Sequence, residues 1–138
     1  MNILKPFVAS LLLLATTAAM AQSAPSTAPP HAIVKTLMTK PLAQHPGEEL
    51  VMISVEYPPG SVDPVHRHNA NALVYVIDGS IVMGLRGSKP VTLGPGQTFY
   101  EGPNDIHEIG RNASNTRPAK FIVVLLKKID APILVPVK

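Results

Sequence analysis

Apolar and polar residues alternate in short segments along this chain from Ile33 to its C-terminal end. Residues 50–57, for example, are dense in valine, isoleucine and methionine, with polar residues at Ser54 and Glu56. A period of two residues is typical of a β-strand with one face buried. No segment after residue 21 carries the sustained apolar period of 3.6 residues that an amphipathic helix requires. The pattern therefore predicts an all-β domain.

Turn residues divide this pattern into many short strands. We expect strands at residues 50–57, 73–77, 80–86, 91–93, 97–101, 106–111, 120–127 and 133–137. Asp78-Gly79 is a strong signal for a two-residue hairpin, so residues 73–77 and 80–86 are expected to pair. Pro132 and Pro136 bracket the last segment, which indicates an edge strand. Short strands separated by glycine and proline turns favour a barrel or a sandwich.

The first 21 residues have the features of a secretory signal peptide. Lys5 supplies a positive charge, and an apolar stretch follows over residues 8–19. This stretch is about 12 residues long, shorter than the roughly 20 residues that a membrane-spanning helix needs. Ala19-Met20-Ala21 matches a small-x-small cleavage site. We expect cleavage after Ala21, a flexible tail at residues 22–32, one domain at residues 33–138, and a periplasmic or secreted protein.

Composition narrows the classes of partner. The chain has no cysteine, which excludes disulfides, thiolate zinc sites and iron–sulfur clusters. The net charge is only +3, and no basic cluster extends beyond Lys127-Lys128, so nucleic acid is not an expected partner. No later segment resembles a membrane-spanning helix, and we expect no membrane association after signal cleavage.

Three histidines have the spacing of a metal site. His66 and His68 are two residues apart, so on an extended strand they point to the same face. His107 follows the turn-forming residues 102–105 in a second short segment. If the two segments lie side by side, three imidazoles converge, and imidazole binds Zn, Cu, Fe and Ni. Three protein ligands would leave coordination positions open for water or a substrate.

These motifs resemble those of the cupin superfamily. Gly60, His66-Arg67-His68 and Gly79 are similar to the first cupin motif, and residues 102–107, followed by Asn112, resemble the second. The local sequence around the second motif is similar to that of small single-domain bacterial cupins, exported members included. The resemblance implies an antiparallel double-sheet jelly-roll barrel that binds a divalent transition metal and acts on, or holds, a small molecule.

Glu101 is the candidate for a ligand that the cupin pattern lacks here. Cupins carry a glutamate four residues after the second histidine of the first motif, and this chain has Ala72 there. Strand alternation places Glu101 on the face of Phe99, and a carboxylate that points into a barrel must be paired or coordinated. We expect Glu101 to bind the metal or to support its ligands; contact with a substrate and a solvent-facing role at the turn are the alternatives. A carboxylate with imidazoles would suit Fe, Mn, Ni or Zn.

Other polar residues receive simpler interpretations. Tyr75 is expected in the core. His31 and His45 are expected to be solvated, the first in the N-terminal tail and the second in an early loop. Arg67 lies between the two paired histidines, so alternation directs it to the opposite face.

Two functions are compatible with this sequence. The first is a metal-dependent enzyme, of the oxygenase or isomerase type, that acts on a small organic molecule. The second is a non-catalytic module that binds a metal or a small ligand in the periplasm. Because the motif glutamate is missing, a metal-free site also stays open. An accessible cavity beside the histidines would favour the enzyme.

The family resemblance also implies a homodimer, with residues 121–126 and 132–137 as candidate contact elements.

Overall fold

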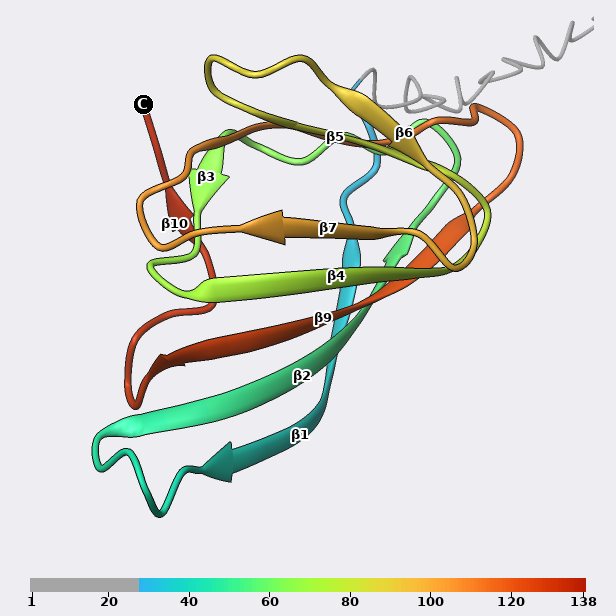
Figure 1. The fold of residues 1–138 in the computed structure, drawn as a ribbon. Helices are drawn as coiled ribbons and strands as arrows, with labels where there is room; N and C mark the ends of the chain where they lie inside the picture. Colours follow the sequence, from blue (N-terminus) through green and yellow to red (C-terminus); the bar gives the residue numbers. More distant parts are fainter. Residues whose placement is uncertain (1–27) are drawn as a thin grey trace, which may run out of the picture.

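The computed structural model describes residues 28–138, and within them the chain forms ten β-strands and no α-helix (Figure 1). The strands are β1 (Ile33–Pro41), β2 (Glu48–Tyr57), β3 (His66–Arg67), β4 (Asn71–Asp78), β5 (Ile81–Leu85), β6 (Val91–Leu93), β7 (Thr98–Glu101), β8 (His107–Asn112), β9 (Ala119–Lys128) and β10 (Val135–Pro136). No helix in this part of the chain could therefore span a membrane. The predicted signal peptide and most of the predicted tail lie outside the described residues.

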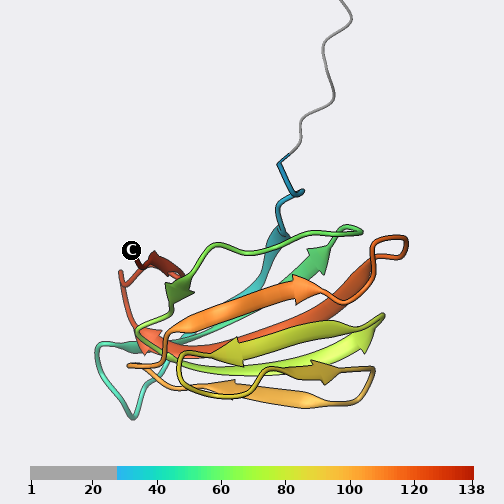
Figure 2. The same ribbon diagram turned by 90° about the horizontal axis from the view of Figure 1, so that it is seen from above.

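The strands form two antiparallel sheets that face each other (Figure 2). Sheet A has the strand order β1-β2-β9-β4-β7, and sheet B has the order β10-β3-β8-β5-β6. In sheet A, β2 and β9 pair along their full length, so they form a long, regular wall of the barrel. The expectation of an all-β, double-sheet jelly roll is confirmed.

The predicted hairpin between residues 73–77 and 80–86 is wrong. The first of these segments lies in β4 of sheet A, whereas the second lies in β5 of sheet B, and the Asp78-Gly79 turn carries the chain between the sheets. A turn signal specifies a local reversal of the backbone and leaves the hydrogen-bonding partner open. Here β5 is buried along nearly its whole length and pairs with β6 and β8, while β4 pairs with β7 and β9.

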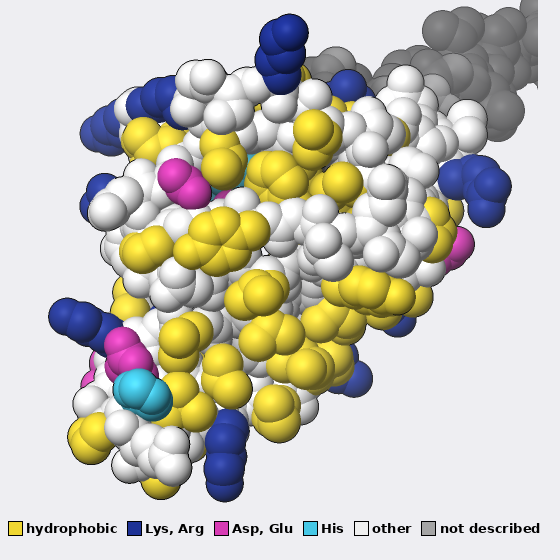
Figure 3. All heavy atoms as spheres, in the orientation of Figure 1, with side chains coloured by type: hydrophobic (Ala, Val, Ile, Leu, Met, Phe, Trp, Pro, Cys, Tyr) yellow, Lys and Arg dark blue, Asp and Glu magenta, His cyan; other side chains and the backbone are white. Residues whose placement is uncertain are grey.

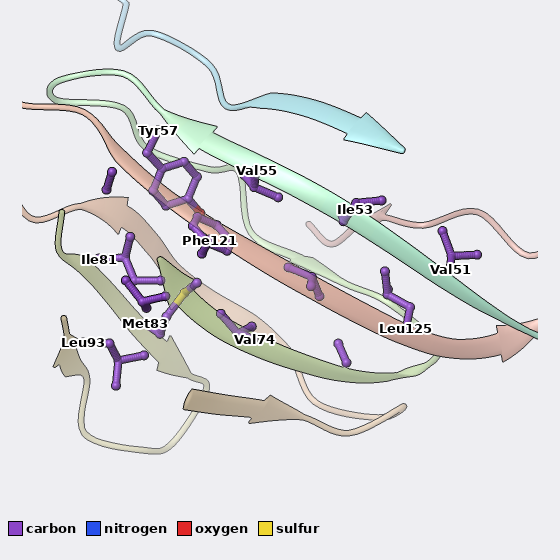
Figure 4. Packing of buried hydrophobic residues seen from close by; sticks show 14 of the residues in the cluster. Val51, Ile53, Val55, Tyr57, Val74, Ile81, Met83, Leu93, Phe121 and Leu125 are labelled. Carbon is purple, nitrogen blue, oxygen red and sulfur yellow. The ribbon is translucent and has the colours of Figure 1, made fainter. Parts of the chain in front are cut away.

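The core lies between the sheets and follows directly from the alternation of the long strands. Residues 51, 53, 55 and 57 of β2 are buried, and residues 121, 123 and 125 of β9 lie opposite them on the same sheet face. In Figure 4, Tyr57 and Phe121 lie near Ile81, Met83 and Val74, and Val51 and Leu125 extend the same cluster toward the other end of the two strands. Burial of each large apolar side chain contributes about 1.5–3 kcal/mol, so this face sets the register of sheet A.

Two further predictions have opposite outcomes. The C-terminal segment is an edge strand as expected, because β10 stands at the border of sheet B. The prediction that Tyr75 belongs to the core is wrong, since its side chain is 50% exposed. In β4 the buried positions are Ala72, Val74 and Val76, and strict alternation directs Tyr75 outward.

Candidate metal centre

The three predicted histidines come together in sheet B. His66 lies on the short strand β3 and pairs in register with His107, the first residue of β8. His68 follows β3 directly, and all three histidines are buried, while Arg67 between them is exposed. The expectation that the two histidine segments lie side by side, with Arg67 on the opposite face, is confirmed. Three imidazoles thus point into the barrel from one wall.

Glu101 approaches the same point from the opposite sheet. It ends β7 in sheet A, and its side chain is 3% exposed. Across the strands it stands in register with Ala72 of β4, the position at which the cupin pattern has its glutamate. Ala72 is fully buried, and its methyl group leaves room for the longer side chain of its neighbour. The carboxylate therefore comes from the adjacent strand instead of from the first motif.

The donor atoms of these four residues are close enough to share one ion. One ligand atom from each of His66, His68, Glu101 and His107 lies within 4.8 Å of all the others. The Glu101 Oε2 atom is 3.4 Å from His107 Nδ1 and 3.5 Å from His68 Nε2. The ring centroid of His66 is 4.8 Å from that of His68 and 4.9 Å from that of His107.

Backbone carbonyls orient two of the imidazoles. His66 Nδ1 donates a hydrogen bond to the carbonyl oxygen of Pro64 at 2.8 Å, and His68 Nδ1 donates to that of Ile133. A carbonyl oxygen only accepts, so each Nδ1 carries the proton and each Nε2 keeps a free lone pair. Such partners fix the tautomer of metal-binding histidines.

His107 supplies an independent test of whether a cation fits. Both of its ring nitrogens are buried, and neither has a hydrogen-bond partner among residues 28–138. An unsatisfied buried polar group costs about 1–3 kcal/mol. A cation held between Glu101 and His107 Nδ1, the ring nitrogen that faces Glu101, would satisfy one of these two nitrogens. Three neutral imidazoles with one carboxylate form a donor set that transition metals accept. The residues present therefore fit a divalent transition metal.

Burial shifts the protonation of the cluster toward neutral forms. Desolvation lowers the pKa of His107 to about 4, and it also lowers the pKa of His68. Desolvation, together with the nearby charges of Asp105 and Asp63, raises the pKa of Glu101 to about 7. The imidazoles of His68 and His107 are therefore neutral and able to bind a cation at neutral pH, and a positive charge beside Glu101 would favour its ionised form.

A cavity of about 370 Å³ opens beside the cluster. Its walls combine the four candidate ligands with apolar side chains from both sheets, including Ile53, Val74, Met83 and Phe121. His31 lies exposed at its border, whereas His45 is exposed in the loop between β1 and β2. Both histidines are solvated as expected.

Sequence reasoning missed a tyrosine–aspartate pair in this cavity. Tyr57 Oη donates a hydrogen bond to Asp63 Oδ2, and both residues line the cavity. The position that a Cβ on Gly110 would occupy lies 3.1 Å from Tyr57 Oη, 3.2 Å from Asp63 Oδ2 and 2.9 Å from His107 Cε1. The pair is therefore next to the histidine cluster. Burial raises the pKa of both groups, so Tyr57 stays neutral and donates.

Two polar residues shape the backbone around the cluster. Asp105 Oδ2 accepts a hydrogen bond from the Gly102 amide at 2.6 Å, which closes the corner that leads into His107. The buried amide of Asn112 donates to the carbonyl oxygens of Tyr57, Pro58 and Arg117. Asn112 of the second motif thus anchors loops and does not touch the candidate metal site.

Comparison with known proteins identifies the family. The family model of the cupin domain matches residues 53–125, more than half of the chain. The chain belongs to the cupin family. Among curated proteins, no sequence matches this cupin. The matched residues include both histidine motifs and Glu101.

Solved structures extend the likeness at the level of the fold. DMSP lyase DddQ from Ruegeria pomeroyi DSS-3 has a TM-score of 0.54 and 25% identity, over 63% of this cupin and 42% of the lyase. An uncharacterised conserved protein with a double-stranded β-helix domain from Klebsiella pneumoniae has a TM-score of 0.61 and 17% identity, over 83% and 89% of the two chains. Oxalate oxidase in complex with the substrate analogue glycolate has a TM-score of 0.61 and 21% identity, over 88% and 63%. This cupin spans less than half of the lyase, and the last two likenesses show the fold alone.

Proposed function

We propose that this cupin is an exported enzyme that binds a divalent transition metal through His66, His68, Glu101 and His107 and acts on a small organic molecule. One observation carries the proposal: the four donor atoms lie within 4.8 Å of one another beside a cavity of about 370 Å³. Export rests on the signal-like sequence of residues 1–21.

The cavity supports catalysis over simple metal storage. A closed site without adjacent space would suit a structural or sensing role, whereas here apolar walls border the candidate metal position directly.

The groups around the cavity would have different roles in catalysis. A bound divalent cation would supply Lewis-acid chemistry by polarising a substrate oxygen. The apolar side chains would bind the carbon skeleton and exclude water. The polar pair of Tyr57 and Asp63 would hold a proton-bearing group of the substrate. Among the structural relatives, the activity named for DMSP lyase is compatible with a small organic substrate.

Metal analysis tests the binding half of the proposal. Protein purified from its native compartment should contain about one equivalent of a divalent transition metal by elemental analysis. The variant His107→Ala should lose it, because one donor of the cluster is removed. The matched control His45→Ala changes an exposed histidine away from the cluster and should retain the metal. Metal-free native protein, or equal metal in both variants, would contradict the proposal.

The intact mass of the protein tests export. A mass that corresponds to a chain beginning at Gln22 would support export, and a mass that includes residues 1–21 would oppose it.

Catalysis is tested by turnover of a panel of small carboxylic acids, ketones and hydroxy acids. Protein stripped with a chelator should be inactive, and the divalent metal identified above should restore turnover. The His107→Ala variant should remain inactive after the same treatment, while His45→Ala should recover. Metal binding without turnover of any member of the panel would favour the non-catalytic alternative.

A further inference from the structure

We infer that the C-terminal segment, residues 132–137, is a working part of the metal centre that positions His68 and walls the cavity. We call this segment the C-terminal strap. The inference rests on the proposed metal binding and adds a structural element that no histidine motif contains. Three separate contacts of the strap support it.

The first contact fixes a metal ligand. The carbonyl oxygen of Ile133 accepts the hydrogen bond of His68 Nδ1, across 65 residues of sequence. Within the part of the chain that the structure describes, this carbonyl is the only hydrogen-bond partner of the His68 ring. It selects the tautomer in which Nε2 keeps its lone pair, and Nε2 is the atom that lies 3.5 Å from Glu101 Oε2. Without this bond, the ring could rotate about its side-chain torsions or exchange tautomers.

The second contact supports the strand that carries His66 and leads directly into His68. β3 has only two residues, and its pairing with β8 is limited to the single register pair of His66 and His107. On its other edge β3 pairs with β10, Val135 opposite Arg67 and Pro136 opposite His66. The amide of Val137 also donates to the carbonyl oxygen of Val65 at 3.0 Å. The strap therefore supplies most of the ladder that holds β3.

The third contact forms part of the cavity wall. The side chains of Ile133 and Leu134 both line it, and Ile133 also packs against the hydrophobic core. Asp130, with a φ of +68°, turns the chain after β9 and directs the strap from sheet A to the edge of sheet B. One segment thus orients a ligand through its backbone and borders the substrate space through its side chains.

Truncation provides the direct test. A variant that ends at Ala131 removes the whole strap, and we expect its zinc affinity to fall 10–100-fold, the loss typical of partners that orient a ligand. Zinc binding is measured by competition with a chromophoric chelator. Deletion of Lys138 alone should leave the affinity unchanged.

A second measurement separates positioning from general destabilisation. In zinc-loaded protein labelled with ¹⁵N-histidine, the Nδ1 protons of His66 and His68 should both be protected from exchange with solvent. Truncation should abolish the protection of His68, whose partner it removes, and reduce that of His66 much less, because its partner Pro64 is local. A structural defect alone would affect both signals equally.

Circular dichroism decides which variant carries the test. If the truncated protein has lost its β spectrum, Val137→Pro replaces it, because proline removes the single amide that donates to Val65. This variant weakens the attachment of the strap and retains Ile133, so it should reduce the protection of the His68 proton only in part, with a smaller fall in affinity. Wild-type zinc affinity with a protected His68 proton, in whichever variant is folded, would overturn the inference. Failure of the wild-type protein itself to bind zinc would overturn the proposed function instead.

Discussion

At the scale of single residues, the position of the candidate carboxylate ligand distinguishes this chain from the usual cupin pattern. The motif glutamate is replaced by Ala72, and Glu101 on the neighbouring strand supplies a carboxylate instead. Ala72 and Glu101 are register partners, so the carboxylate lies one strand away from its place in the cupin pattern. It still lies close to the three histidines. Neighbouring strands lie about 4.8 Å apart, a displacement that a glutamate side chain can bridge. The exchange preserves the donor set with a different sequence motif.

We expect Glu101→Gln to lower the affinity for a divalent metal at least about 10-fold, because a charged ligand of the ion is lost. Isothermal titration measures the affinity. Glu108→Gln is the matched control, since Glu108 is exposed and pairs with Arg86 at 3.1 Å on the outside of sheet B. Adding Ala72→Glu to Glu101→Gln should restore binding through the neighbouring strand. Unchanged affinity in Glu101→Gln would remove Glu101 from the site.

The same residue predicts how the metal-free protein responds to pH. The folded pKa of Glu101, about 7, lies above its usual 4.5, so its stabilising contribution is present at low pH and is lost as pH rises toward 7. The folded pKa of His107, about 4, lies below its usual 6.5, so its contribution grows with pH between these values. The two effects oppose each other between pH 4.5 and 6.5.

Glu101→Gln should remove the first effect and leave the second. In the presence of a chelator, the free energy of unfolding of this variant should rise with pH between 4.5 and 6.5 more steeply than that of wild type. The slopes should differ by at most about 1.4 kcal/mol per pH unit. Urea unfolding across this range checks the prediction, and Glu108→Gln should behave like wild type. Parallel curves for Glu101→Gln and wild type would show that Glu101 does not titrate there.

Tyr57 contributes to stability through its bond to Asp63. We expect Tyr57→Phe to lower the free energy of unfolding by about 1.5–3 kcal/mol, because a hydrogen bond to a charged, partly buried group is lost. Tyr75→Phe is the matched control. Its hydroxyl belongs to a half-exposed side chain, so its effect should stay within about 0.5 kcal/mol. Equal effects of the two substitutions in chemical denaturation would refute a special role for the Tyr57 hydroxyl.

At the scale of elements, the crossing between β4 and β5 depends on Gly79. Its φ of +71° favours glycine, and a Cβ there would stand 2.6 Å from the carbonyl oxygen of Pro118. This close approach is possible because the turn passes directly over the beginning of β9. Glycine is therefore required at position 79 of the cupin-like motif, because the turn after β4 packs closely against the start of β9.

Gly79→Ala should destabilise the fold far more than Gly87→Ala. Gly87 has a similar φ of +81°, but a methyl group added there would meet nothing within 4 Å, so its substitution carries only backbone strain of about 1 kcal/mol. The difference between the two free energies of unfolding measures the steric conflict with Pro118 and the start of β9. Similar values in urea denaturation would mean that the backbone around Gly79 relaxes freely.

At the scale of the whole molecule, the outer face of sheet A is unusually apolar for a surface. Leu73 and Tyr75 of β4 and Tyr100 of β7 are each at least half exposed, and Figure 3 shows hydrophobic side chains gathered on this side of the molecule. β9 runs through the middle of the sheet, where Ile122 and Val124 are partly buried. A contiguous patch of this kind is typical of an interaction surface.

We expect this face to form the predicted homodimer. Leu73→Asp should shift the protein toward monomer in sedimentation velocity at tens of micromolar, because a charge would be buried in the contact. Val91→Asp places the same charge at a similarly exposed apolar position of sheet B and should leave association unchanged. A wild-type protein that sediments only as monomer would contradict the prediction.

Local pattern was sufficient for much of this protein. Alternation predicted all-β structure and the inward side of Glu101, and the spacing of His66 and His68 predicted that they share a face. The period of a strand is a property of the backbone itself, so it can be read without knowing the partners. The cupin-like motifs then implied the convergence of His107 on the same site.

Tertiary structure alone decided how the strands are distributed and what supports the site. It assigned β4 and β5 to different sheets, turned Tyr75 outward, and brought Tyr57 to Asp63. It also placed the carbonyl of Ile133 against His68. Every residue has a carbonyl, so such a contact leaves no signature in sequence; it arises only when packing brings distant segments together. The candidate ligands of this site can thus be identified from the sequence, whereas their orientation is a property of the folded molecule.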